Sequence, residues 1–184
     1  MKSIFLVLTI SLLMLGCSEN KQPVSESPAD IPEKDPIVIM DPLSGTNLVD
    51  NIKLFDLEGS AIDLKQFTGK KIFLNFWATW CKPCILEMPN IEHAQELLSD
   101  DNYVFLLASD EAVGRINRFK ATHEFELDLV RVETPFLDIG ILSLPTTIII
   151  DQEGKIAYNH VGAQEWDSPQ LIEKLRNLNH TPSE

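Results

Sequence analysis

The chain has 184 residues, 44% of them hydrophobic, so it is long enough for one domain of ordinary size with a complete apolar core. Its 28 acidic and 15 basic residues give a formal net charge of -13. An acidic excess of this size argues against nucleic acids and anionic lipid surfaces as partners, because both would repel the chain.

The first 16 residues have the pattern of a removable leader. Lys2 supplies a positive charge, and the stretch 4–15 is apolar except for Thr9 and Ser11. As a helix this stretch would span roughly 18 Å, which is too short for a bilayer hydrocarbon core of about 30 Å. We therefore predict a signal peptide over residues 1–16 rather than a transmembrane anchor.

The leader ends in a sequence that is similar to a bacterial lipobox, Leu13-Met14-Leu15-Gly16-Cys17. This similarity implies that Cys17 is lipidated, becomes the first residue of the mature protein and holds it at a membrane on the extracytoplasmic (periplasmic) side. The alternative is an ordinary secretory leader followed by a chance cysteine. Lipidation would remove Cys17 from the three cysteines of the chain and leave one pair.

Residues 17–42 have the composition of a tether. They contain five prolines, six acidic residues and few large apolar residues before Ile37. Such a segment cannot bury enough apolar surface to offset the entropy lost on ordering. We predict an acidic, proline-containing linker between the lipid and a domain over residues 43–184.

Hydrophobic periodicity in the domain predicts alternating strands and helices. Strands are predicted at 52–55, 72–78, 103–108, 146–150 and 155–160. The stretch 72–78 is apolar on both faces except at Asn75, which is typical of a central, covered strand. Helices are predicted as a short turn at 63–67, after Cys84, at 111–123 and from Ser168 onward. This order predicts an α/β fold with a mixed central sheet flanked by helices.

The motif Cys81-Lys82-Pro83-Cys84 lies between a predicted strand and a predicted helix. Two cysteines three residues apart at a helix start share one face, close enough to alternate between dithiol and disulfide. The same spacing occurs in half of a zinc site, but no second Cys-x-x-Cys and no His-x-x-x-His follows. A redox pair is therefore favoured, and neither a metal nor another cofactor is predicted.

The run from Asn75 to Cys84, followed by Leu144-Pro145-Thr146-Thr147, resembles the thioredoxin superfamily. More narrowly, it is similar to the TlpA/ResA group of membrane-tethered, extracytoplasmic thiol-disulfide oxidoreductases, and the similarity covers about residues 47–178. It implies a thioredoxin-like fold, protein thiols and disulfides as substrates, and regeneration by a transmembrane thiol carrier. A reductant is expected, for example of apocytochrome c, acting as a monomer. The alternatives are a thiol oxidase of the same fold and a chaperone that binds Cu(I) through its thiolates.

The resemblance implies a role for each residue of the motif. Cys81 would be the nucleophile, since a helix N-terminus and the neighbouring Lys82 both favour a thiolate. Cys84, which we expect to be more covered, would resolve the mixed disulfide. Lys82 and Pro83 match the variable dipeptide that tunes the reduction potential in this superfamily.

Proton handling is predicted at Glu87. Thioredoxins carry a buried acid where this chain has Asn75, and an amide cannot transfer a proton. Glu87 follows Cys84 by three residues and so shares its helical face. The hypothesis is that Glu87 raises the pKa values of the cysteines and gates proton transfer; the alternative is a solvated glutamate.

The remaining candidates surround the motif. Trp80, Leu144 and Pro145 are predicted to contact substrate, with a cis peptide bond before Pro145 and with the Leu144 backbone free to pair with an extended substrate strand. Trp77 is predicted to lie in the core. The four histidines show no ligand spacing to the cysteines and are predicted to be structural or solvated: His93, His123, His160 and His180.

Overall fold

The computed structural model describes residues 48–178. The predicted signal peptide, Cys17 and the tether lie outside these residues, as does His180, so those assignments stay predictions. No helix within 48–178 has the length and apolarity needed to cross a bilayer.

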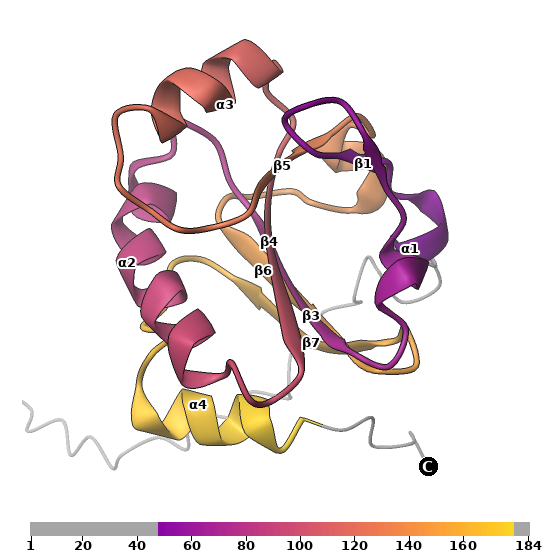
Figure 1. Ribbon diagram of the computed structural model, residues 1–184, viewed down its shortest axis with the longest axis vertical. Helices are drawn as coiled ribbons and strands as arrows, with labels where there is room; N and C mark the ends of the chain where they lie inside the picture. The colour runs from indigo at the N-terminus through magenta and orange to yellow at the C-terminus, as the bar shows by residue number, and fades with distance from the viewer. Residues whose placement is uncertain (1–47, 179–184) are drawn as a thin grey trace, which may run out of the picture. The chain divides into compact units, whose positions relative to one another are not determined.

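A seven-stranded mixed sheet forms the centre of the fold, in the order β2-β1-β5-β4-β3-β6-β7 (Figure 1). The strand β3 runs parallel to β4 and antiparallel to β6, and β4 also pairs with β5 in parallel. The strands are β1 (Leu54–Phe55), β2 (Ala61–Ile62), β3 (Lys71–Phe76), β4 (Tyr103–Ser109), β5 (Leu129–Val132), β6 (Thr146–Ile150) and β7 (Ile156–Val161). The predicted α/β fold with a mixed central sheet is confirmed.

Helices cover both faces of the sheet. They are α1 (Leu48–Asn51), α2 (Lys82–Leu97), α3 (Val113–Lys120) and α4 (Pro169–Arg176), with short 3-10 helices η1 (Leu64–Phe67) and η2 (Phe136–Ile139). One core layer joins α2, α3 and α4 to the sheet through Phe73, and the other joins α1, η1 and η2 through Leu74. Figure 1 shows α2 and α1 on opposite sides of the sheet.

The alternation of side chains along β3 decides where its one polar residue lies. All six residues of β3 are buried. Because successive side chains point to opposite faces, Asn75 faces the same side as Phe73, which is the side of α2. The sheet therefore presents an amide to the helix that carries the cysteines.

Several boundaries differ from the predicted ones. The strand predicted at 52–55 is paired only at Leu54–Phe55, and the one predicted at 72–78 is β3, which ends at Phe76. The helix predicted at 111–123 spans only Val113–Lys120, since Glu111 turns back toward another loop, as described below. The strands β2 and β5 were not predicted, because runs of two and four residues are too short to show a periodicity.

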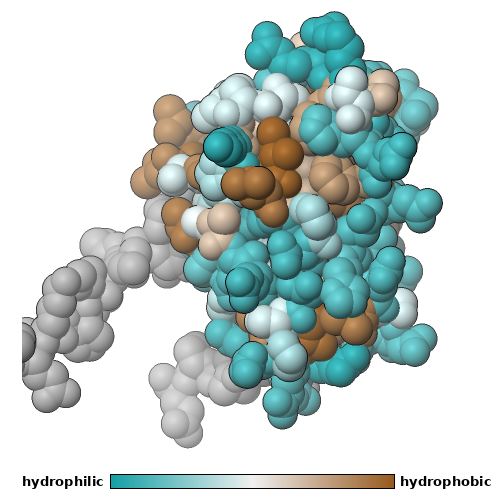
Figure 2. All heavy atoms as spheres, turned by 90° about the vertical axis from the view of Figure 1, so that its left-hand side faces the viewer, coloured by the Kyte–Doolittle hydropathy of each residue, from teal (hydrophilic) through white to brown (hydrophobic). Residues whose placement is uncertain are grey.

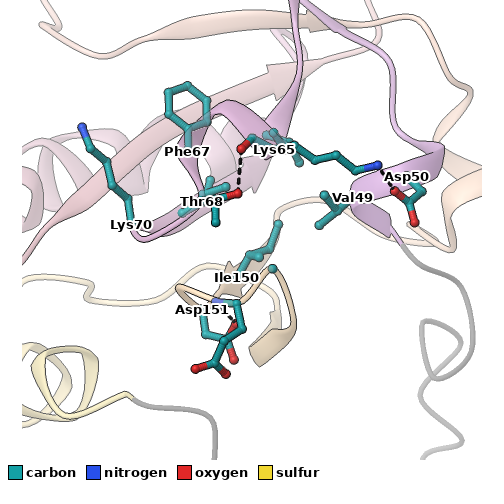
Figure 3. A pocket seen from close by; sticks show the side chains of 12 residues that line it. Val49, Asp50, Lys65, Phe67, Thr68, Lys70, Ile150 and Asp151 are labelled. Carbon is teal, nitrogen blue, oxygen red and sulfur yellow. Dashed lines mark hydrogen bonds and ion pairs between the residues drawn. The ribbon is translucent and has the colours of Figure 1, made fainter.

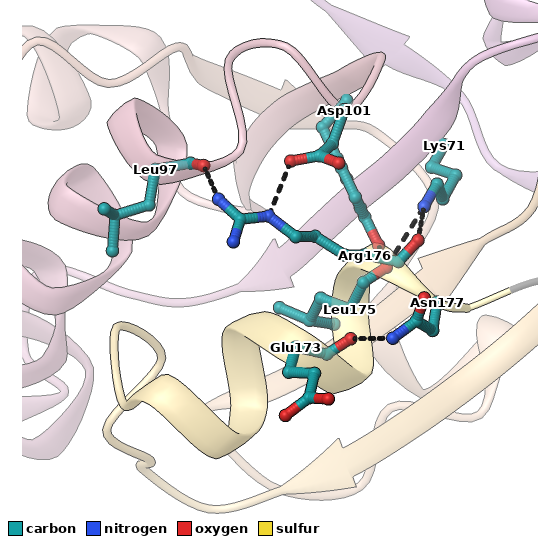
Figure 4. Close-up of polar contacts among 8 residues, drawn as sticks. Lys71, Leu97, Asp101, Glu173, Leu175, Arg176 and Asn177 are labelled. Atoms are coloured by element: carbon teal, nitrogen blue, oxygen red, sulfur yellow. Dashed lines mark hydrogen bonds and ion pairs between the residues drawn. The ribbon is translucent and has the colours of Figure 1, made fainter.

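A buried lysine fastens the last helix to the sheet (Figure 4). Lys71 Nζ donates hydrogen bonds to the carbonyl oxygens of Leu175 at 3.1 Å and Arg176 at 2.8 Å. These carbonyls lie in the last turn of α4, where few helical N–H groups remain to donate to them. The Leu175 carbonyl also accepts from the Tyr103 hydroxyl at 2.7 Å. Arg176 in turn donates to Asp101 Oδ2 at 3.0 Å and to the carbonyl of Leu97 at 2.8 Å. Burial lowers the pKa of Lys71.

Candidate active site

Cys81 and Cys84 form a disulfide at the start of α2, with their Cα atoms 5.3 Å apart. Cys81 is the N-cap residue, and its Sγ accepts a hydrogen bond from the Cys84 backbone N–H at 3.3 Å. Cys84 is the more covered of the two, with 1% of its surface exposed against 4% for Cys81. In the dithiol form, the helix N-terminus and this N–H group favour a thiolate on Cys81.

The chain reverses direction between β3 and α2 through a short loop. The Trp77 N–H donates to the carbonyl of Ala108 at 3.0 Å, and the Cys81 N–H donates to the carbonyl of Ala78 at 3.0 Å. Pro83 occupies the first turn of α2, where a missing N–H costs little. Lys82 and Pro83 are both exposed, whereas Trp77 is fully buried, as predicted.

Glu87 is buried one turn beyond Cys84, with 3% of its surface exposed. Its Oε1 accepts from Asn75 Nδ2 at 3.0 Å, and its Oε2 accepts from Trp166 Nε1 at 3.0 Å and from the Gln164 N–H at 3.1 Å. Burial raises the pKa of Glu87, and these hydrogen bonds partly oppose the rise. The alternative of a solvated glutamate is therefore wrong.

Asn75 has a structural role that the sequence did not indicate. Its Nδ2 donates both to Glu87 and to Thr147 Oγ1, the latter at 2.9 Å. The amide at this position cannot transfer a proton, but its hydrogen bond orients the carboxylate of Glu87.

Sequence reasoning missed Gln164 and Trp166, which complete the surroundings of Glu87. Trp166 is fully buried and packs its ring edge-on against Phe73, with ring centroids 4.9 Å apart. The one sequence signal for their role was a tryptophan between two acidic residues in a segment without periodicity, because a large aromatic residue there suggests a buried position.

The segment before β6 reaches the same end of the sheet as the cysteine loop, because Thr146 pairs with Phe76. The Leu144–Pro145 peptide bond is cis, as predicted, and the Pro145 carbonyl accepts from the Gly162 N–H at 2.8 Å. Pro145 is buried and Leu144 is half-buried.

Apolar side chains are exposed near this end of the sheet. Trp80, directly before Cys81, is 70% exposed, and Leu142, three residues before Pro145, is 73% exposed. Leu86 on α2 is also exposed. Figure 2 views the molecule from the left of Figure 1 and shows apolar side chains gathered mainly in the upper half of that face, with hydrophilic side chains over most of the rest.

The described histidines take structural or surface positions, as predicted. His93 contacts Asp167, His123 stacks on Phe119, and His160 lies against Trp166. Among residues 48–178, no group of three or more His, Cys, Asp and Glu side chains is placed to hold a metal ion.

A small cavity of about 150 Å³ lies away from the redox pair (Figure 3). Its lining includes Ile72 and Ile150, which pair at the end of β3 opposite Phe76. The Lys65–Asp50 ion pair also borders it. None of the predicted site residues lines this cavity.

Comparisons with known proteins show which family the chain belongs to. A family model described as Redoxin matches residues 44–175. The thiol-disulfide oxidoreductase ResA of Bacillus thuringiensis subsp. konkukian is 34% identical over 131 residues, which cover 70% of this chain and 75% of that protein. The thioredoxin-like protein YneN of Bacillus subtilis is 34% identical over 116 residues, covering 61% and 68%.

Solved structures show the same fold. An exposed lipoprotein thioredoxin from Streptococcus pneumoniae has 25% identity and a TM-score of 0.56, covering 66% of this chain and 97% of that one. A thiol:disulfide interchange protein from Bacteroides sp. has 23% identity and a TM-score of 0.60, covering 68% and 86%. The chain belongs to the redoxin family and is a thiol-disulfide oxidoreductase with a thioredoxin-like fold.

Proposed function

We propose that this enzyme reduces disulfide bonds of proteins outside the cytoplasm, held at a membrane by a lipid on Cys17. The observation that carries the proposal is the Cys81–Cys84 pair at the N-terminus of α2, one turn from the buried carboxylate of Glu87. The relatives named thiol-disulfide oxidoreductase support protein thiols as the substrate class.

The reaction transfers two electrons from the dithiol to the substrate. The Cys81 thiolate attacks one sulfur of a substrate disulfide, forms a mixed disulfide and releases the other substrate sulfur as a thiolate, which takes up a proton. Cys84 then loses its proton and attacks Cys81 Sγ, which closes the Cys81–Cys84 disulfide and releases the substrate as a dithiol. A transmembrane thiol carrier would reduce the enzyme again.

Glu87 is proposed to exchange the proton that Cys84 loses. It follows Cys84 by one helical turn. Burial raises the pKa of Glu87, and a proton-transfer group is most effective when its pKa lies close to the working pH. A carboxylate there also opposes thiolate formation on the cysteines by charge repulsion. Replacing Glu87 with Gln should change the pH dependence of thiolate formation, followed by thiolate absorbance; an unchanged profile would remove Glu87 from the mechanism.

Trp80, Leu144 and Pro145 are proposed to contact the substrate. The exposure of Trp80 and the shared sheet end of the two segments support this role. The backbone of Leu144 would pair with an extended substrate strand. Lys82 and Pro83, exposed in the first turn of α2, would set the reduction potential.

Extracytoplasmic attachment is supported by the lipobox-like sequence at Cys17 and by the similarity to the pneumococcal protein that is described as an exposed lipoprotein. Replacing Cys17 with Ala should move the protein from the membrane fraction to the soluble fraction. A protein that stays at the membrane after this change would contradict the lipid anchor.

Outside the cytoplasm, one task that fits the resemblance to the ResA group is to keep the cysteines of apocytochrome c reduced.

The decisive experiment traps the substrate in the host. The full chain with Cys84→Ser should accumulate mixed disulfides between Cys81 and extracytoplasmic proteins, identified by mass spectrometry. The double variant Cys81→Ser/Cys84→Ser is the control and should trap none. Capture of nothing above this control would refute the proposed function.

The reduction potential of the Cys81–Cys84 pair separates reductase from oxidase. We expect a value near that of thioredoxin, about -270 mV, whereas a value near about -120 mV would identify the oxidase alternative.

A further inference from the structure

A second carboxylate with a largely covered side chain binds the loop that leads to the redox pair. Glu111 follows the end of β4 by two residues, and its side chain is 8% exposed. Its Oε2 accepts a hydrogen bond from the Thr79 backbone N–H at 2.6 Å, and its Oε1 accepts from the Thr79 hydroxyl at 2.9 Å. Thr79 is two residues before Cys81, so Glu111 binds two donor groups of one residue in the loop that leads to the nucleophile.

The carboxylate of Glu111 is itself held from both sides. Arg115 Nη1, in the first turn of α3, donates to Oε1 at 3.3 Å. Ser109 Oγ, at the end of β4, donates to Oε2 at 3.4 Å and accepts from the Glu111 N–H at 3.3 Å. Hydrogen bonds to an ionised acceptor are stronger than neutral ones, so this set of donors favours one orientation of the side chain. The position of Thr79 is thereby tied to β4 and α3.

The loop needs this anchor because its most exposed residue has little packing of its own. Trp80 lies between Thr79 and Cys81 and is 70% exposed, so its orientation depends on the backbone on either side of it. Backbone hydrogen bonds hold the loop at Trp77 and at Cys81. Glu111 holds it between these two points.

We propose that Glu111 is a positioning residue for the reaction with protein disulfides. By holding Thr79, it fixes the Trp80 ring relative to Cys81 Sγ, so that a substrate segment resting on the ring presents its disulfide to the sulfur. The inference rests on the proposed function, but it predicts a difference between substrates. A small disulfide needs only Cys81, whereas a protein substrate needs Trp80 and Cys81 in a fixed relation.

The test compares two substrates with the full chain carrying Glu111→Gln. Glutamine removes the negative charge that strengthens the bonds to Thr79. Its oxygen can accept the Thr79 N–H, but its NH₂ group then replaces the oxygen that accepts from Arg115 Nη1, so that bond is lost and the contact with the Thr79 hydroxyl becomes a neutral one. For a protein disulfide such as insulin, KM should rise by about tenfold with kcat changed less than about threefold. The rate constant of the dithiol form with 5,5′-dithiobis(2-nitrobenzoate) should change by less than about threefold.

Variants of Thr79 separate positioning from a general loss of structure. Thr79→Val removes only the hydroxyl bond and should raise KM for insulin in the same direction by a smaller factor. Thr79→Ser retains both donors and should keep the wild-type values. Glu92→Gln is a matched control, because Glu92 Oε1 accepts the Glu126 backbone N–H in a different loop. That variant should leave unchanged the KM and kcat for insulin and the rate constant with 5,5′-dithiobis(2-nitrobenzoate).

The proposal is overturned if Glu111→Gln slows both substrates by the same factor, or if it changes neither. Should Glu111→Gln not fold, Thr79→Val decides, and an unchanged KM for insulin in that variant overturns the proposal as well. A wild-type chain that reduces neither substrate would instead refute the proposed function, so the two failures are distinguishable.

Discussion

Replacing Trp166 with Phe removes one of the three hydrogen-bond donors to the buried carboxylate of Glu87. The Trp166 Nε1–H donates to Glu87 Oε2 at 3.0 Å, and the indole is fully buried between Phe73 and His160. Phenylalanine keeps an aromatic ring at the site but cannot donate. The variant should therefore fold with lower stability, and the loss should depend on the charge of Glu87.

The size of the loss follows from two contributions. A hydrogen bond to an ionised group contributes about 1.5–3 kcal/mol. The smaller ring leaves a void that adds about 1 kcal/mol. We expect the free energy of unfolding of Trp166→Phe to fall by about 2.5–4 kcal/mol near neutral pH.

The pH dependence has a defined sign. Burial raises the pKa of Glu87, so between its ordinary and its raised pKa the native state binds more protons than the unfolded state. In that window, the contribution of Glu87 to stability falls as the pH rises. The bond from Trp166 lowers the pKa of Glu87, and its removal raises that pKa further. The loss caused by Trp166→Phe should be largest above the folded-state pKa and should shrink as the pH falls through it.

Urea unfolding of the oxidised protein at about pH 4 and about pH 8 measures this difference, because ordinary carboxyl groups titrate near the lower value. The same substitution in a Glu87→Gln background completes a double-mutant cycle and should show no pH-dependent component from this contact. Equal destabilisation at both pH values, or a pH dependence that persists without Glu87, would refute the reasoning.

Two further substitutions test contacts that position the sheet and the site. Lys71→Met should lower the free energy of unfolding by about 1–3 kcal/mol and speed hydrogen exchange in α4, because the Arg176 carbonyl loses the Lys71 donor and the Leu175 carbonyl loses one of its donors. Lys70→Met, at an exposed lysine, is the control, and equal effects of the two variants would contradict the role of Lys71. Asn75→Asp should place a second carboxylate about 3.0 Å from Glu87 and destabilise the protein more at about pH 8 than at about pH 4, since like charges repel. Urea unfolding measures the two losses of stability, and losses of equal size at both pH values would count against this repulsion.

Much of the fold could be predicted from the sequence, because local patterns are enough for the longer elements. The strand at 146–150 was predicted with the boundaries it has, and the helix from Ser168 begins at Pro169 as α4. The motif around Cys81 and Cys84 indicated a redox pair, since spacing at a helix start is a property of three consecutive peptide bonds. The prediction that Glu87 shares the face of Cys84 also needed only helical geometry.

The environment of Glu87 could not be predicted in this way. Its carboxylate meets Trp166 and Gln164, which lie 79 and 77 residues away in the sequence, and it meets Asn75 from a neighbouring strand. These contacts depend on the order of strands in the sheet and on how the segment after β7 returns over α2. Periodicity within a segment carries no information on either.

The sequence by itself determined the redox pair, its place at the start of a helix and the nature of the sheet, because each follows from the chemistry and spacing of neighbouring residues. Only the tertiary structure decided which side chains surround the pair. It buried Glu87 under three donors and turned Glu111 from an expected helix start into an anchor for Thr79. The physical reason is that a carboxylate becomes buried and paired only when segments distant in the chain pack against it.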